Sequence, residues 1–256
     1  MIAQVAVLHQ PAFWVMGFLS IFIIGLAKGG FTGLGMLGTP ILALAVPPVQ
    51  AAAIILPLLL VQDAVGVWAF RKSWDAHVLK IMIPAAIVGI ALGWAFAAVL
   101  PDRWVLGALG VMSVVFASHR LWIERGGRAA PAQIWPDWAG FLCGIGSGIT
   151  SQIAHAGKPP LQIWVLPRRL PRDVLVGTTS IQFAAMNWIK VPAYAALGAF
   201  TPSNLIASAA LLPIAILSTL AGVKLVRRVK PEAFYLLAYT LLLLVGILLI
   251  RNALVA

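Results

Sequence analysis

One segment decides the fold: Ser147-Gly-Ile-Thr-Ser-Gln-Ile-Ala-His-Ala-Gly-Lys-Pro-Pro-Leu-Gln162. It places a histidine, a lysine, hydroxyl and amide side chains and a Pro-Pro pair inside a long apolar run. A counterpart lies in the first half, where Ala27-Lys-Gly-Gly-Phe-Thr-Gly33 is followed by Gly38-Thr-Pro40. Glycine and proline pairs interrupt helical hydrogen bonding, and within a bilayer such a break is stable only beside protein or water. The two segments therefore predict interrupted helices that meet at a cavity.

The composition is that of a membrane protein. Of the 256 residues, 62% are hydrophobic and 10% are charged, and the mean hydropathy is +1.00. A soluble domain is about 25% charged. The length leaves no room for a soluble domain beside many spans, so residues 1–256 are predicted to form a single membrane domain. The one cysteine, Cys143, excludes an intrachain disulfide.

Ten apolar segments follow one another, some near the ~20 residues of a membrane span and some shorter. Their predicted ranges are 12–27, 33–46, 50–69, 78–100, 104–122, 136–150, 159–167, 174–198, 203–225 and 232–251. Residues 123–135 form the one predicted linker, because they are rich in charge and helix breakers. The linker leaves five segments on each side.

Basic residues fall in alternate gaps between these segments. Examples are Arg71-Lys72, Arg168-Arg169 and Arg227-Arg228, whereas Pro47-Pro48 occupies a gap of the other set. The basic side of a membrane protein is cytoplasmic, so both termini are predicted to face outside. The net charge of +11 is thus interpreted as orientation rather than nucleic-acid binding. The opening residues lack the basic region of a signal peptide, and the first segment is expected to be retained.

The two halves resemble each other, which predicts an internal repeat. Matching positions are Gly38-Thr-Pro40 with Gly157-Lys-Pro159, Pro84 with Pro213, and Pro101 with Pro231. Since each half has five segments, the repeats would be inverted, with repeat one at 12–122 and repeat two at 136–256. The predicted fold is an all-α polytopic membrane protein whose broken or short helices meet near the bilayer midplane, as in many transporters. The alternative is a chance likeness among apolar helices.

Candidate binding residues lie at the breaks, where helix N-termini present free N–H groups to anions. The predicted substrate-binding residues here are Lys28, Gly29, Gly30, Thr39, Ser151, His155 and Lys158. A lysine within a membrane is costly and is therefore a functional candidate. The alternatives are that Lys28 extends to the cytoplasmic face, that Lys158 reaches the outer headgroups, and that His155 is a packed neutral histidine. His155 is also a candidate for proton coupling.

Polar side chains also interrupt the segment 174–198. The predicted ligands are Thr178, Thr179, Gln182, Asn187 and Lys190, because hydroxyls, amides and one charge can hold a tetrahedral oxyanion. The alternative is that they join neighbouring helices. Asp63 lies at the equivalent place in the first half and is expected to pair with Lys190 or to relay a proton.

Other chemistry has little support in the sequence. Gly157-Lys158 lacks the spacing of a phosphate-binding loop, and Ser147 lacks the flanks of a hydrolase nucleophile. The four histidines are scattered, so no metal site is predicted, and no cofactor is predicted either. Small-residue ladders such as Gly140, Gly144 and Gly148 are interpreted as close helix packing.

The sequence resembles the TauE/SafE family of sulfite-exporter or toluene-sulfonate-uptake permeases. In the first half the likeness rests on Gly25-Leu-Ala-Lys28-Gly-Gly-Phe31 and Pro48-Val-Gln50, and in the second half on Ala154-His155-Ala156-Gly157 and Lys190-Val-Pro192. The resemblance implies a bacterial inner-membrane permease that moves small sulfur oxyanions or sulfonates and is linked to protons. Lys158 departs from the family pattern, in which glycine is common at this position.

The leading hypothesis is therefore an alternating-access carrier of a small sulfur-containing anion, and not an enzyme. Its partners would be the anion and the lipid bilayer, with no nucleic acid, and the sequence leaves open whether it forms a homodimer. A passive anion channel is the second hypothesis. An intramembrane enzyme or a structural subunit of a membrane complex is the third.

Overall fold

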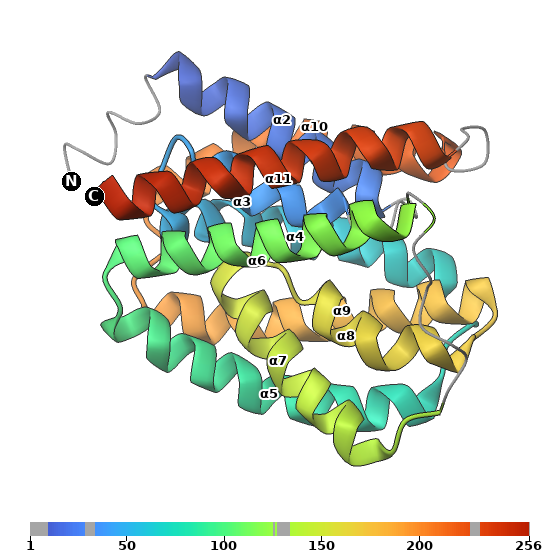
Figure 1. The fold of residues 1–256 in the computed structure, drawn as a ribbon. Coiled ribbons are helices and arrows are strands. Elements are labelled where there is room, and N and C mark those ends of the chain that lie inside the picture. Colours follow the sequence, from blue (N-terminus) through green and yellow to red (C-terminus); the bar gives the residue numbers. More distant parts are fainter. Residues whose placement is uncertain (1–9, 29–33, 125, 127–133, 226–230, 256) are drawn as a thin grey trace.

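The computed structural model describes residues 10–28, 34–124, 126, 134–225 and 231–255. Every regular element in these ranges is a helix. The elements are α2 (Pro11–Lys28), η2 (Leu34–Leu37), α3 (Gly38–Leu42), α4 (Pro48–Phe70), α5 (Ala76–Val99), α6 (Asp102–Glu124), α7 (Asp137–Ala154), α8 (Lys158–Val165), η3 (Leu166–Arg168), α9 (Arg172–Ala196), α10 (Pro202–Leu225) and α11 (Pro231–Val255). The long helices are roughly aligned (Figure 1).

The ten expected segments all correspond to helical structure, with ends within a few residues of the predicted ones. Prolines and glycines set several of these ends. Pro47 and Pro171 precede α4 and α9 in extended conformations, as expected for residues that cannot donate a backbone hydrogen bond. The short segments 33–46 and 159–167 become the η2–α3 and α8–η3 pairs.

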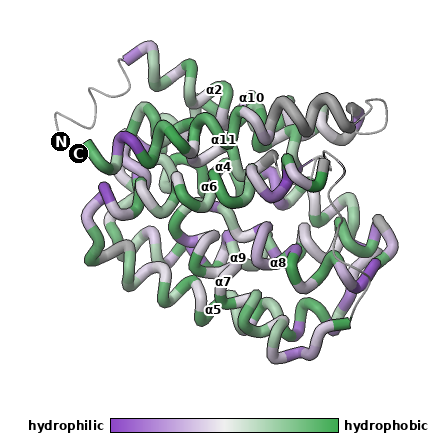
Figure 2. Tube along the Cα trace, viewed as in Figure 1, coloured by the Kyte–Doolittle hydropathy of each residue, from purple (hydrophilic) through white to green (hydrophobic). Residues whose placement is uncertain are grey.

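Five of the described helices are long and apolar enough to cross a membrane. They cover Pro11–Lys28, Pro48–Phe70, Ala76–Phe96, Asp102–Ile123 and Pro202–Gly222. Helices α7 and α9 have 18 and 25 residues, yet they are not in this set. Both contain hydrophilic residues along their length (Figure 2), and several of these, such as Ser147, Gln182 and Lys190, are buried inside the protein.

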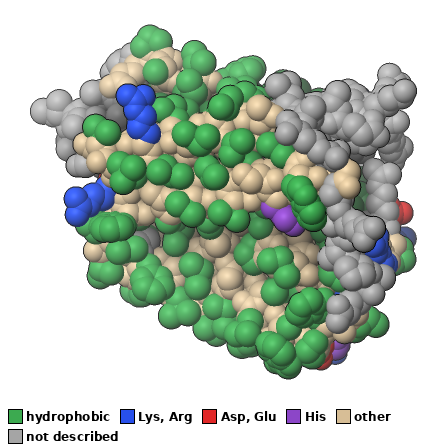
Figure 3. Space-filling view, viewed as in Figure 1, with side chains coloured by type: hydrophobic (Ala, Val, Ile, Leu, Met, Phe, Trp, Pro, Cys, Tyr) green, Lys and Arg blue, Asp and Glu red, His purple; other side chains and the backbone are tan. Residues whose placement is uncertain are grey.

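The outer surface is apolar where a bilayer would surround it. Large hydrophobic side chains such as Val115, Ile163, Trp188 and Leu217 are more than half exposed. Figure 3 shows hydrophobic side chains across the visible face, with lysine and arginine near its ends. An apolar surface of this extent is stable in lipid and would aggregate in water.

The helices pack in pairs that cross between the two halves of the sequence. Helix α2 lies along α10, α5 along α7, α6 along α11 and α4 along α9. One hydrophobic cluster is shared by α2, α3, α4, α6, α10 and α11, and another by α5, α7, α8 and α9. The packed units therefore mix helices from both sides of the linker.

Glycines allow α5 and α7 to approach at backbone distance, which confirms the expected packing role of Gly144 and Gly148. A Cβ on Gly148 would overlap the Ala86 carbonyl oxygen, and one on Gly89 would overlap that of Ile145. Neither backbone can move without separating the helices.

We expect Gly89→Ala to destabilise the protein by about 2–3 kcal/mol, because the added methyl group forces α5 and α7 apart. Gly107→Ala is the matched control, since its Cβ would lie 3.5 Å from the Ala253 Cβ, an ordinary contact. Thermal unfolding of the two variants in detergent compares them. Equal melting temperatures would contradict the close approach.

Candidate functional site

The chain reverses between α7 and α8 through a strained residue. His155 caps α7 in the left-handed conformation, with φ of 52°. Such a conformation is uncommon for a residue other than glycine and is often found at functional sites. The buried Ser147 hydroxyl donates to the Gly157 carbonyl oxygen at 2.7 Å, which ties the start of α8 back to α7. This arrangement holds the His155 side chain inside the protein.

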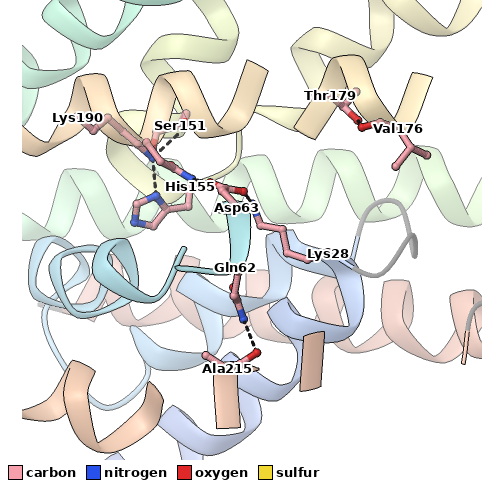
Figure 4. Close-up of polar contacts among 10 residues, drawn as sticks. Lys28, Gln62, Asp63, Ser151, His155, Val176, Thr179, Lys190 and Ala215 are labelled. Carbon is pink, nitrogen blue, oxygen red and sulfur yellow. Dashed lines mark hydrogen bonds and ion pairs between the residues drawn. The ribbon is translucent and has the colours of Figure 1, made fainter. Parts of the chain in front are cut away.

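A buried lysine contacts His155. The Lys190 side chain on α9 is 0% exposed. Its Nζ lies 2.7 Å from His155 Nδ1 and donates to the Ser151 hydroxyl and carbonyl oxygens at 3.1 and 3.2 Å (Figure 4). His155 Nε2 lies 2.9 Å from the Ala52 carbonyl oxygen. Because a carbonyl only accepts, Nε2 carries a proton, and Nδ1 is then free to accept from the lysine.

Asp63 on α4 forms the second part of the cluster. Its carboxylate makes an ion pair with Lys28 at the end of α2 and accepts a hydrogen bond from the Asn187 amide of α9. Asp63 is 2% exposed and Lys28 is 17% exposed. Phe183 lies below the Lys28 ammonium, with its ring centroid 6.0 Å from Nζ. In Figure 4, Asp63 lies between Lys28 and the Lys190–His155 pair.

The two parts form one site, the charged cluster, made of Lys28, Asp63, His155, Asn187 and Lys190. Asn187 and Lys190 are three residues apart on α9 and thus share a face. Lys158 is the first residue of α8. It makes no hydrogen bond or ion pair with another described residue.

The cluster contains more basic than acidic side chains. Lys28 pairs with Asp63, whereas Lys158 and Lys190 pair with no carboxylate among the described residues. Buried charges are normally paired, because an uncompensated ion in a low-dielectric interior is costly. The site is therefore suited to an anion.

Several predicted ligands do not join the cluster. Thr178 accepts from the Asp75 amide at 2.8 Å, and Thr179 bonds to carbonyl oxygens of its own helix. The Gln182 amide donates to the Met82 carbonyl oxygen at 3.2 Å. Thr178 and Gln182 thus bond to residues outside α9 and Thr179 bonds within it, and their role as ligands stays a prediction. Figure 4 shows Thr179 well apart from Lys190.

Other predicted residues have mixed outcomes. Asp63 pairs with Lys28 and Asn187, so its expected pairing with Lys190 is wrong, whereas its alternative role as a proton relay stays a prediction. The Thr39 hydroxyl is buried and has no hydrogen-bond partner among the described residues. Gly29 and Gly30 lie outside the described residues.

Two aromatic residues that were not predicted as site residues, Tyr194 and Phe183, contact the cluster. The Tyr194 ring stacks on the His155 ring with centroids 6.1 Å apart and planes 12° apart. Tyr194 comes four residues after Lys190, one helical turn along the same face, so helical spacing could have indicated it. Phe183 carries no such signal, because it is one of many apolar residues in α9.

Comparison with known proteins agrees with this architecture. The chain matches the protein family described as sulfite exporter TauE/SafE over residues 17–249, which is nearly its whole length. No curated protein and no solved structure gave a significant match. The chain therefore belongs to the sulfite exporter TauE/SafE family and is a multi-pass membrane protein of an exporter-type transporter family.

Proposed function

We propose that this chain is a secondary transporter that binds a small sulfur oxyanion, such as sulfite or an organosulfonate, at the charged cluster. The observation that carries the proposal is the surplus of basic side chains over carboxylates at the cluster. Lys28 pairs with Asp63, and the buried Lys190 has no carboxylate partner among the described residues. Lys28 and Lys190 would supply charge to the anion. The Asn187 amide and the Ser151 hydroxyl would supply hydrogen bonds.

Two inverted repeats around this site are supported by matching geometry in α4 and α9. The N-cap residues Pro47 and Pro171 have φ/ψ of −51°/143° and −51°/144°. Asp63 and Asn187 each lie 16 residues further on (63 − 47 and 187 − 171), and they bond to each other. Residues at equivalent positions that touch across two related helices are what a two-fold axis produces.

Packing elsewhere supports the same relation. If α2 to α6 correspond to α7 to α11, then the α2–α10 contact becomes the α5–α7 contact, and both are present. Ser20 donates to the Gly38 carbonyl oxygen at 2.8 Å, just as Ser147 donates to that of Gly157. A hydrogen bond from a serine hydroxyl to a glycine carbonyl oxygen thus holds the interrupted helices in both repeats.

The charged cluster also supports proton coupling. In the structure the Asp63 carboxylate is paired with the Lys28 ammonium, so an entering anion competes with Asp63 for Lys28. A proton on Asp63 would release Lys28 to the substrate. The Lys190–His155 contact can hold one proton between the two nitrogens, and His155 offers a second place for a transported proton.

The orientation follows from the basic residues. Exposed Arg71, Lys72 and Arg169 lie in connections at one end of the helices, whereas α2 begins and α11 ends at the other (Figure 1). With the basic end in the cytoplasm of a bacterial inner membrane, both termini face the periplasm. Alternating access would arise as the two hydrophobic clusters move about the α4–α9 contact.

The test is a flux assay with purified protein in liposomes. Labelled sulfite is loaded inside, and its release is measured with and without a pH gradient and with competing sulfate, taurine or chloride. We expect saturable release that unlabelled sulfite accelerates by exchange and that the pH gradient alters. Release without saturation or exchange would indicate a channel, and no release above protein-free liposomes would contradict the proposal.

A further inference from the structure

We propose that Gln152 forms a second polar stop for the transported anion, separated from the charged cluster by the ring of Tyr194. The inference rests on the proposed transport function and adds the route by which the anion leaves the cluster. The Gln152 side-chain amide is not part of the charged cluster. Gln152 is 2% exposed, and neither its amide nitrogen nor its amide oxygen has a hydrogen-bond partner among the described residues.

Tyr194 contacts both the charged cluster and Gln152, and its ring is the proposed barrier between them. The ring stacks on that of His155, and the hydroxyl donates to the backbone carbonyl oxygen of Gln152 at 2.6 Å. Beyond the stack, the ring packs with Ala52, Leu56 and Phe200 in a separate hydrophobic cluster. Tyr194 is 2% exposed, so the barrier is closed in this structure.

A small cavity lies beside the Tyr194 ring and is also lined by Gln152. It is lined by Val49, Val105, Gln152, Ile153, Tyr194 and Leu197, and its volume of about 10 Å³ holds roughly one water-sized group. Val49 and Val105 belong to the first turns of α4 and α6, and Leu197 caps α9. These helix ends lie at the end of the molecule where α2 begins (Figure 1). The cavity therefore lies between the charged cluster and that end.

The amide suits an oxyanion in transit. Its NH₂ group donates to anion oxygens, and its carbonyl accepts from a protonated oxyanion or from an accompanying water. A buried amide left without a partner costs free energy. A passing anion would give the Gln152 amide a hydrogen-bond partner and so remove this cost. Because the amide is uncharged, it would not hold the anion tightly.

The experiment compares binding with transport. We expect Gln152→Met, which keeps the length of the side chain, to slow labelled sulfite flux in liposomes about tenfold while the sulfite Kd of the detergent-purified protein changes less than about twofold, since one buried hydrogen bond is lost outside the binding cluster. Ser208→Ala is the control. Ser208 is also buried, but its hydroxyl bonds to the Ile54 and Asn204 carbonyl oxygens outside the cavity, so flux should stay near wild type.

Two further variants make the outcome decisive if Gln152→Met folds poorly. Gln152→Glu places a carboxylate in the route and should slow sulfite flux at least as much. Tyr194→Ala removes the barrier and should raise sulfite leak in the absence of a pH gradient. Wild-type flux in both Gln152 variants, or a Kd that weakens in parallel with flux, would overturn the transit site. Failure of the proposed function looks different, because wild-type liposomes would then release no sulfite.

Discussion

Replacing Lys190 with methionine is expected to reduce sulfite flux by about a hundredfold or more. Lys190 is fully buried and places its ammonium against Ser151 and His155, where an entering anion would meet it. Loss of one charge from a desolvated, hydrogen-bonded pair typically costs 2–5 kcal/mol, and each ~1.4 kcal/mol is a factor of ten. Flux by purified protein in liposomes measures the effect.

The variant should still fold, because methionine has a similar length and an apolar replacement for a buried charge is often tolerated. Lys80→Met is the matched control. Lys80 is exposed on α5 and makes no contact with the charged cluster, so its removal should leave flux near wild type. If Lys190→Met is monodisperse and transports at the wild-type rate, Lys190 is not a ligand of the anion.

The second large effect is expected for Asp63→Asn, which should uncouple transport from protons. Asparagine keeps the shape of the side chain but has no proton to gain or release. Its one amide oxygen can still accept from Lys28, and its NH₂ can donate to the Asn187 amide oxygen once that amide rotates. One proton moved with each anion changes the steady-state sulfite ratio about tenfold per pH unit. We expect that dependence in the wild type, at a clamped membrane potential, and its absence in the variant.

Sulfite binding gives the control for this variant. Without the competing carboxylate, Lys28 should be free for the anion, so affinity should be retained or increased. A variant that binds sulfite and still responds to the pH gradient as the wild type does would exclude Asp63 as the coupling group and leave His155 as the candidate.

The helices could be predicted closely because their boundaries are set locally. Apolar runs define the spans, and Pro47-Pro48, Pro101 and Pro171 stop or start them by removing backbone donors. The pairing of α2 with α10 and of α5 with α7 had no such local signal. This pairing depends on which glycine-containing helix faces pack against each other, and the paired helices are far apart in the sequence.

The site was only partly predictable, because helical spacing gives the direction of a side chain and not its depth. Thr179 and Lys190 are 11 residues apart, so their directions nearly coincide, yet a rise of 1.5 Å per residue separates them by about 16 Å. Thr179 therefore bonds to its own helix near one end of α9, while Lys190 reaches the cluster.

The partner of Asp63 could not be chosen from the sequence either. Three lysines lie near breaks or within apolar runs, and their charges look alike in a sequence. The choice follows from the crossing of α4 with α9, which places Asn187 on one carboxylate oxygen and leaves the other to Lys28.

The central claim is that a small oxyanion binds between the buried lysines, and equilibrium binding tests it most directly. Isothermal titration of sulfite into the purified protein should give saturable binding to one site per chain in the wild type and in Lys80→Met, and no saturable binding in Lys190→Met. Equal sulfite affinity in the wild type and in a folded Lys190→Met variant would contradict the claim.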